Sequence, residues 1–78
     1  MNETARGDGR TLLAADSFET IEDLKTRGKS GDYCDVVEDG KNYRYIVREV
    51  SVDIVTWIRW EDGRYDKPGR WTHVRRAA

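Results

Sequence analysis

The spacing of hydrophobic residues changes along the chain, and this change predicts one helix followed by a β-sheet. Phe18, Ile21 and Leu24 recur at intervals of three, which places them on one face of a helix over residues 17–27. Ser17 can cap the start of this helix because its hydroxyl can accept a hydrogen bond from the first turn. The single apolar stripe predicts that one face of the helix packs against a sheet.

Beyond the helix the hydrophobic period falls to two, which is typical of strands. We expect strands over residues 33–38 and 42–50, joined by the tight turn Asp39-Gly40. A third strand is expected over residues 52–60. The side chains that share its apolar face, and that we expect to be buried, are Val52, Ile54, Ile58 and Trp60.

Residues 61–70 are polar and rich in turn-forming residues, so we expect a loop there, followed by a short strand over residues 71–75. The pattern therefore predicts the α+β class, with one short helix packed on a three- or four-stranded antiparallel β-sheet. Residues 1–10 contain little apolar mass and are predicted to be a flexible arm. Residues 11–78 are predicted to form a single α+β domain.

Composition narrows the class of protein. The chain has 78 residues, of which 37% are hydrophobic and 37% are charged, as expected of one small folded domain. Its apolar runs are too short to span a membrane, and its first residues lack the pattern of a signal peptide. We therefore expect no membrane partner and a cytoplasmic location.

The residues that support catalysis or metal binding are few. Cys34 is the only cysteine and His73 the only histidine, so neither a disulfide nor a thiolate metal cluster is expected. Cys34 is best interpreted as a small buried hydrophobe on a strand. The serines lack the glycine-flanked turn of a catalytic nucleophile. We predict no catalytic residues, no metal and no cofactor, and hence a protein that is not an enzyme.

Charge is divided unevenly along the chain, although the formal net charge is only −1. Residues 1–40 carry five basic and ten acidic side chains, whereas residues 41–78 carry nine basic and five acidic ones. Opposite charges of this kind can pair within the fold or form two separate surface patches.

Aromatic and basic residues gather in the C-terminal half, and this mixture is typical of a binding surface. The candidate partner-binding residues are Trp57, Arg59, Trp60, Arg64, Tyr65, Arg70 and Trp71. We expect these residues to bind another protein or a glycan. Single-stranded nucleic acid is the weaker interpretation because the net charge is negative. The alternative is that the tryptophans form the core of a chain that has only one phenylalanine.

Five short motifs occur in the order seen in a small module of bacteriophage tail fibres and tailspikes. They are Thr20-Ile21-Glu22-Asp23-Leu24, Gly31-Asp32, Val36-Val37, Tyr43-Arg44-Tyr45 and Gly69-Arg70-Trp71. The chain resembles that module over roughly residues 18–74. The resemblance implies a phage virion or accessory protein that binds a virion component or a host protein, located in the virion or in the host cytoplasm. A phage-encoded inhibitor of a host defence system is the alternative.

A second resemblance is to the small chitin-type carbohydrate-binding modules, which carry exposed aromatic rings on a short sheet. It depends on Gly31-Asp32, Gly40-Lys41, Tyr43, Pro68 and Trp71. It implies that Trp57, together with Trp60 or Tyr65, would stack on a sugar.

Overall fold

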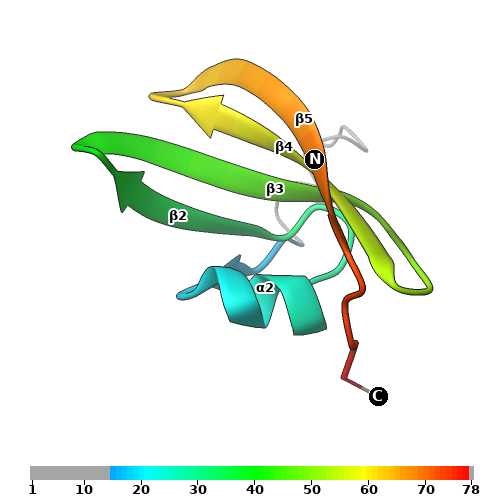
Figure 1. The fold of residues 1–78 in the computed structure, drawn as a ribbon. Helices are drawn as coiled ribbons and strands as arrows, with labels where there is room; N and C mark the ends of the chain where they lie inside the picture. Colours follow the sequence, from blue (N-terminus) through cyan, green and yellow to red (C-terminus); the bar gives the residue numbers. More distant parts are fainter. Residues whose placement is uncertain (1–14, 78) are drawn as a thin grey trace, which may run out of the picture.

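The computed structural model describes residues 15–77, which form a curved β-sheet with one helix (Figure 1). The predicted arm, residues 1–10, lies outside the described residues. In chain order the elements are β1 (Ser17–Phe18), α2 (Ile21–Arg27), β2 (Tyr33–Glu38), β3 (Lys41–Ser51), β4 (Ile54–Glu61) and β5 (Arg64–Thr72).

The five strands follow one another across the sheet in the order β1-β2-β3-β4-β5. The first pair is parallel and the remaining three pairs are antiparallel. The expected three- or four-stranded antiparallel sheet is therefore wrong, because the sheet has five strands and is mixed.

The strand that the pattern did not predict is β1, which occupies the start of the predicted helix. The helix begins later because Thr20 is its N-cap, and the Thr20 hydroxyl accepts a hydrogen bond of 3.1 Å from the Asp23 backbone N–H. Ser17 is thus free to pair with the start of β2. Two possible caps three residues apart explain why the sequence pattern placed the helix one turn too early.

The final strand, which was expected over residues 71–75, lies earlier in the chain: β5 ends at Thr72 and replaces most of the predicted loop, and residues 73–75 are not strand. Its pairing with β4 runs from Arg64 to Thr72 and includes Pro68 and Gly69, which sequence patterns favour in turns. Proline is tolerated here because β5 is the outer strand, where a residue without a backbone N–H need not break the ladder. Gly69 allows close packing, because a Cβ at this position would collide with the ring of Trp57.

The expectation for the buried face of the third strand is also wrong. Val52 belongs to the turn before β4, is 90% exposed, and precedes Asp53 with its positive φ of 72°. Within β4 the fully buried residue is Val55, and Trp57 packs beside it. The side chains of Val55 and Trp57, and not those of Ile54 and Ile58, therefore face the core.

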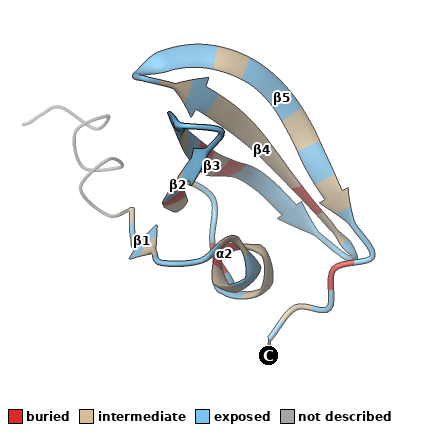
Figure 2. Ribbon diagram, turned by 60° about the vertical axis from the view of Figure 1, so that its left-hand side comes forward, coloured by how far each residue is buried: buried red, intermediate tan, exposed pale blue. Residues whose placement is uncertain are grey.

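The core lies on one face of the sheet, between the sheet and α2 (Figure 2). Its buried apolar side chains are Leu24, Cys34, Tyr45, Val47, Val55 and Val74. We call this side of the sheet the covered face. The segment after β5 also lies here, because the Arg76 guanidinium donates to the Lys25 and Gly28 carbonyls at the end of α2, at 2.7 and 2.5 Å.

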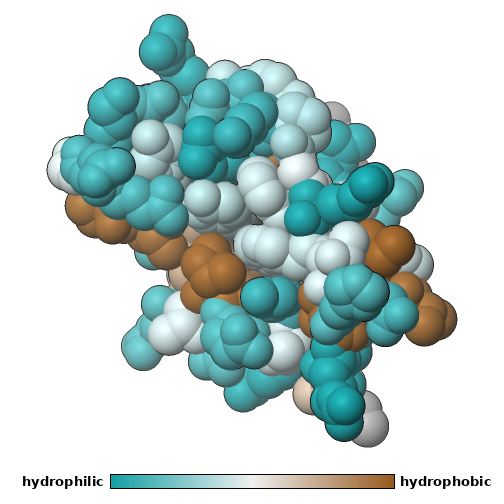
Figure 3. Space-filling view, in the orientation of Figure 1, coloured by the Kyte–Doolittle hydropathy of each residue, from teal (hydrophilic) through white to brown (hydrophobic). Residues whose placement is uncertain are grey.

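The surface in the orientation of Figure 1 is mostly polar (Figure 3). Hydrophobic residues appear between the edge of the sheet and α2, and at the end of the β3–β4 hairpin (Figure 3). Among residues 15–77, no helix has both the length and the apolar character needed to cross a membrane.

Candidate functional site

The face of the sheet opposite α2 is the main candidate for a binding surface, and we call it the open face. Residues paired across neighbouring strands point to the same side of a sheet, so the register defines which side chains share this face. Two rows of four side chains run across the sheet from β2 to β5. They are Asp35, Arg44, Trp60 and Tyr65, and Tyr33, Ile46, Ile58 and Pro68. No described helix packs on them, since α2 lies on the other side (Figure 2).

The second row is the apolar centre of the open face. Tyr33, Ile46 and Ile58 are half-buried, and Pro68 is exposed. In the first row, the side chains of Trp60 and Tyr65 are 37% and 59% exposed. The result is a continuous strip of aromatic and aliphatic side chains on a rigid sheet, of the kind that forms the centre of protein interfaces.

Arg44 is fixed in position within the first row. Its guanidinium donates two hydrogen bonds to the carboxylate of Asp35, at 2.7 and 3.0 Å. It also lies 4.1 Å from the centre of the Tyr33 ring, where the ring face attracts the cation. The hydrogen bonds from Arg44 lower the pKa of Asp35, although partial burial acts in the opposite direction. The three side chains therefore form a pre-organised polar cluster beside the apolar strip.

Two of the hollows in the described part of the molecule border the open face. The larger, of about 510 Å³, is lined by Asp35, Val36, Val37, Asn42, Tyr43, Arg44, Trp60, Asp62 and Gly63. We call it the Trp60 groove. Most of these residues belong to the open face at the end of the sheet where the β2–β3 and β4–β5 turns lie. The smaller, of about 440 Å³, lies beside Arg48, Glu49, Thr56 and Arg70.

The structure divides the predicted binding residues between the two faces. Trp60, Tyr65 and Arg70 lie on the open face, where Arg70 is the partner of Thr56. Trp57 and Trp71 lie on the covered face and pack against Tyr45, with ring centroids 5.0 and 6.1 Å away. Trp57 and Trp71 therefore pack against the core, whereas Trp60 is exposed on the open face.

Arg59 and Arg64 also lie outside the open face. Arg59 pairs with Asp66 at 2.8 Å and lies 4.3 Å from the centre of the Tyr43 ring. The pKa of Arg59 is raised by the hydroxyl of Tyr45 and by the carboxylate of Asp66. Arg64 is exposed and follows the β4–β5 turn, in register with Glu61.

Sequence reasoning missed six members of the two rows on the open face, namely Tyr33, Asp35, Arg44, Ile46, Ile58 and Pro68. In a strand over residues 42–50, the alternation of side chains places Tyr43 and Tyr45 on one face and Arg44 and Ile46 on the other. What was lacking was the register that places them next to Trp60. The sugar-stacking pair implied by the second resemblance does not form, because Trp57 lies on the covered face and Trp60 and Tyr65 on the open one.

Cys34 and His73, the side chains best suited to catalysis or metal binding, do not belong to the rows of the open face. Cys34 is fully buried in the core, where burial raises the pKa of its thiol. His73 is exposed just beyond β5 and has a positive φ of 58°. Across residues 15–77, no group of three or more metal-binding side chains comes together.

With this geometry in view, the chain was compared with known proteins. No protein-family model, no curated protein and no solved structure matches it. The open face must therefore be interpreted from its own chemistry.

Proposed function

We propose that this chain is a non-enzymatic protein-binding module that docks a partner protein on its open face. The observation that carries the proposal is the strip formed by Ile46, Ile58, Trp60 and Tyr65, with Arg44 fixed beside it. Tryptophan, tyrosine and arginine are the residues that most often dominate binding energy at protein interfaces. A pre-ordered sheet also loses little conformational freedom when it binds.

A protein partner suits the open face better than a nucleic acid or a glycan. Asp35 neutralises Arg44, and Asp62 borders the Trp60 groove, so the field near the exposed rings does not favour a phosphate backbone. Sugar binding by stacked rings would need flat aromatic faces beside polar donors and acceptors. The polar neighbours in the row of Trp60, Arg44 and Asp35, are already bonded to each other, and the neighbours in the second row are Ile58 and Pro68.

The setting that we propose is a bacteriophage virion or accessory protein, and its support is the order of the five motifs shared with the tail-fibre module. A partner in the virion would make the chain a structural or assembly component. A bacterial partner would instead make it an inhibitor of a host system, and the same surface serves both cases.

The test is site-specific photo-crosslinking in the cells or lysate from which the protein is obtained. In one variant a photoreactive phenylalanine replaces Tyr65 on the open face. In the control variant it replaces Val52, a residue that is more exposed than Tyr65 but lies at the β3–β4 turn. We expect a crosslinked partner protein from position 65 and none from position 52. Crosslinks from position 65 to the chain's own N-terminal segment, or only to a second copy, would contradict the proposal.

The identified partner is then purified and its affinity is measured by calorimetry. Trp60→Ala is expected to weaken binding by about tenfold or more, as is usual for a central aromatic residue of an interface. Val52→Ala is the matched control and should leave affinity unchanged. Circular dichroism of both variants establishes that the sheet is intact, so that a loss of affinity reports on the surface.

A further inference from the structure

The Trp60 groove has the shape and the charge to take one particular kind of side chain. Its apolar wall is formed by Trp60 and Val37, which are 37% and 68% exposed. Its polar residues include Asp62 at the β4–β5 turn and the paired Asp35 and Arg44. An occupant must therefore combine apolar length with a polar end.

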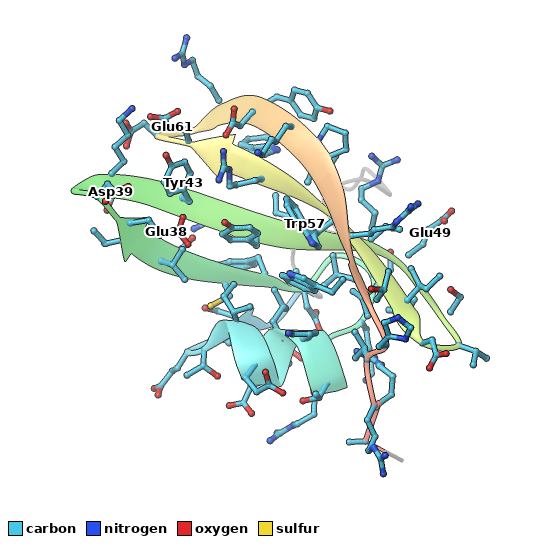
Figure 4. All side chains as sticks on the ribbon, viewed as in Figure 1. Glu38, Asp39, Tyr43, Glu49, Trp57 and Glu61 are labelled. Carbon is cyan, nitrogen blue, oxygen red and sulfur yellow. The ribbon has the colours of Figure 1, made fainter. Side chains whose placement is uncertain are left out.

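The charges around the groove decide the sign of that polar end. Three basic side chains at this end of the sheet are already engaged in ion pairs, namely Lys41 with Glu61, Arg44 with Asp35 and Arg59 with Asp66. Within residues 15–77, Glu38, Asp39 and Asp62 have no such partner. Figure 4 shows Glu38, Asp39 and Glu61 at this end of the sheet. Arg64, beside the β4–β5 turn, also has no such partner among the described residues, so three unpaired negative charges outweigh one unpaired positive charge next to the groove.

We propose that the Trp60 groove receives an arginine or lysine side chain of the partner protein. The hydrocarbon part of that side chain lies along Trp60 and Val37, and its cation faces the Asp62 carboxylate and the indole ring. An acidic side chain is disfavoured because the cation it would need, Arg44, is already paired with Asp35, and the other charge that lines the groove is the negative charge of Asp62. This inference rests on the proposed function and adds the chemistry of the partner's anchoring residue.

The first experiment uses blocked amino acids as probes and needs no knowledge of the partner. N-acetyl-arginine amide is titrated into the isotope-labelled protein, and the indole N–H signal of Trp60 and the amide signal of Gly63 are followed by NMR. Blocked norleucine, which is apolar, and blocked glutamate, which is acidic, are titrated in parallel. We expect saturable shifts at both positions with arginine, weaker shifts with norleucine and none with glutamate.

The second experiment compares two matched variants, Asp62→Asn and Asp39→Asn. Each aspartate occupies the first position of a two-residue turn before glycine, with a φ of 51° for Asp62 and 53° for Asp39. Asparagine is well tolerated in such turns, so both changes remove a charge without disturbing the backbone. Only Asp62 lines the groove. Asp62→Asn is expected to weaken arginine binding about two- to fivefold, whereas Asp39→Asn should not change it.

Three results would overturn the inference: no shift at Trp60 with arginine, an equal shift with glutamate, or equal binding by Asp62→Asn and the wild type. These failures can be told apart from a failure of the proposed function. If the photo-crosslinked partner still depends on Trp60 while the arginine probe does not bind, the open face is the interface but the anchoring residue is not basic.

Discussion

At the scale of single residues, Asp32 shows how one carboxylate can join several elements. It is only 4% exposed, and its two oxygens accept hydrogen bonds from the backbone N–H groups of Asp16 and Lys29, at 2.9 and 2.8 Å. Its own carbonyl accepts from the Val47 N–H at 2.8 Å. Asp32 thus connects the residue before β1, the segment after α2 and strand β3. The Gly31-Asp32 motif therefore has a structural role in this chain.

We predict that Asp32→Asn lowers the free energy of unfolding by about 1–3 kcal/mol. An amide has one acceptor oxygen in place of two, so one buried N–H would lose its partner and face an NH₂ group instead. Urea denaturation followed by tryptophan fluorescence measures the change. Asp39→Asn serves as the control, because Asp39 is exposed in a turn that accommodates asparagine, and it should differ little from the wild type. Equal stability of the two variants would contradict this role for Asp32.

At the scale of elements, the sequence is most informative where local signals agree. The strand over residues 33–38 and the turn at Asp39-Gly40 are confirmed because alternating side chains lead directly into a dipeptide that adopts positive φ at both positions. The start of β5 was placed too late, at residue 71, because Pro68 and Gly69 favour turns by their local preferences. Its formation depends on pairing with β4 and on the ring of Trp57, which occupies the space above Gly69.

The candidate site was predictable in composition but not in placement. Residue type singled out Trp60 and Tyr65, which are exposed, but also Trp57 and Trp71, which have the same chemistry and pack against the core. Which face a strand residue occupies depends on register, and the pairing of β4 with β5 shifts by one residue between Arg59 and Trp60. A shift of this kind leaves no mark in the hydrophobic pattern.

The last segment of the chain acts together with the helix. Arg76 donates to the carbonyls of Lys25 and Gly28, and the Ala77 N–H donates to the carbonyl of Thr26 at 3.0 Å. These carbonyls lie at the end of α2, where no further turn of helix can satisfy them. A positive charge at the C-terminus of a helix is also favoured by the helix dipole. The segment is thereby held against the core, which it completes with Val74.

Arg76→Ala is expected to destabilise the fold by about 1–2 kcal/mol, because two carbonyls at the end of the helix would lose a charged donor. Arg75→Ala is the matched control, since Arg75 is the exposed neighbour with the same charge. Thermal unfolding by circular dichroism compares the two. A shift of the melting temperature that is the same in both variants would show that net charge, rather than the hydrogen bonds of Arg76, is responsible.

At the scale of the whole molecule, the two ends of the sheet are stabilised by different forces. One end is held by the apolar core under α2 and the final segment. The other end, at the β2–β3 and β4–β5 turns, carries one ion pair across each antiparallel strand pair. These are Arg44 with Asp35 between β2 and β3, Lys41 with Glu61 between β3 and β4, and Arg59 with Asp66 between β4 and β5. Electrostatic contacts therefore replace apolar burial where the helix does not reach.

This division predicts that acid loosens the turn end of the sheet before it unfolds the core. The pKa of Asp35 is lowered in the folded state by its hydrogen bonds from Arg44. Its ionised form therefore stabilises the fold, and this contribution is present above the usual aspartate pKa of about 4 and is lost as the pH falls through the lowered value. Partial exposure of the pair keeps the contribution modest.

Hydrogen exchange, corrected for the intrinsic effect of pH on exchange rates, tests this prediction. Between pH 6 and pH 3, protection of the paired amides of residues 35–38 and 41–44 should fall more than that of Val47 and Val55 in the core. In Asp35→Asn the same amides should already be less protected at pH 6 and should change less on acidification, because the titrating group is gone. A uniform loss of protection along the sheet would mean that the core and the turn end unfold as one unit, and that the ion pairs do not confer a separate stability on the end of the molecule that carries the Trp60 groove.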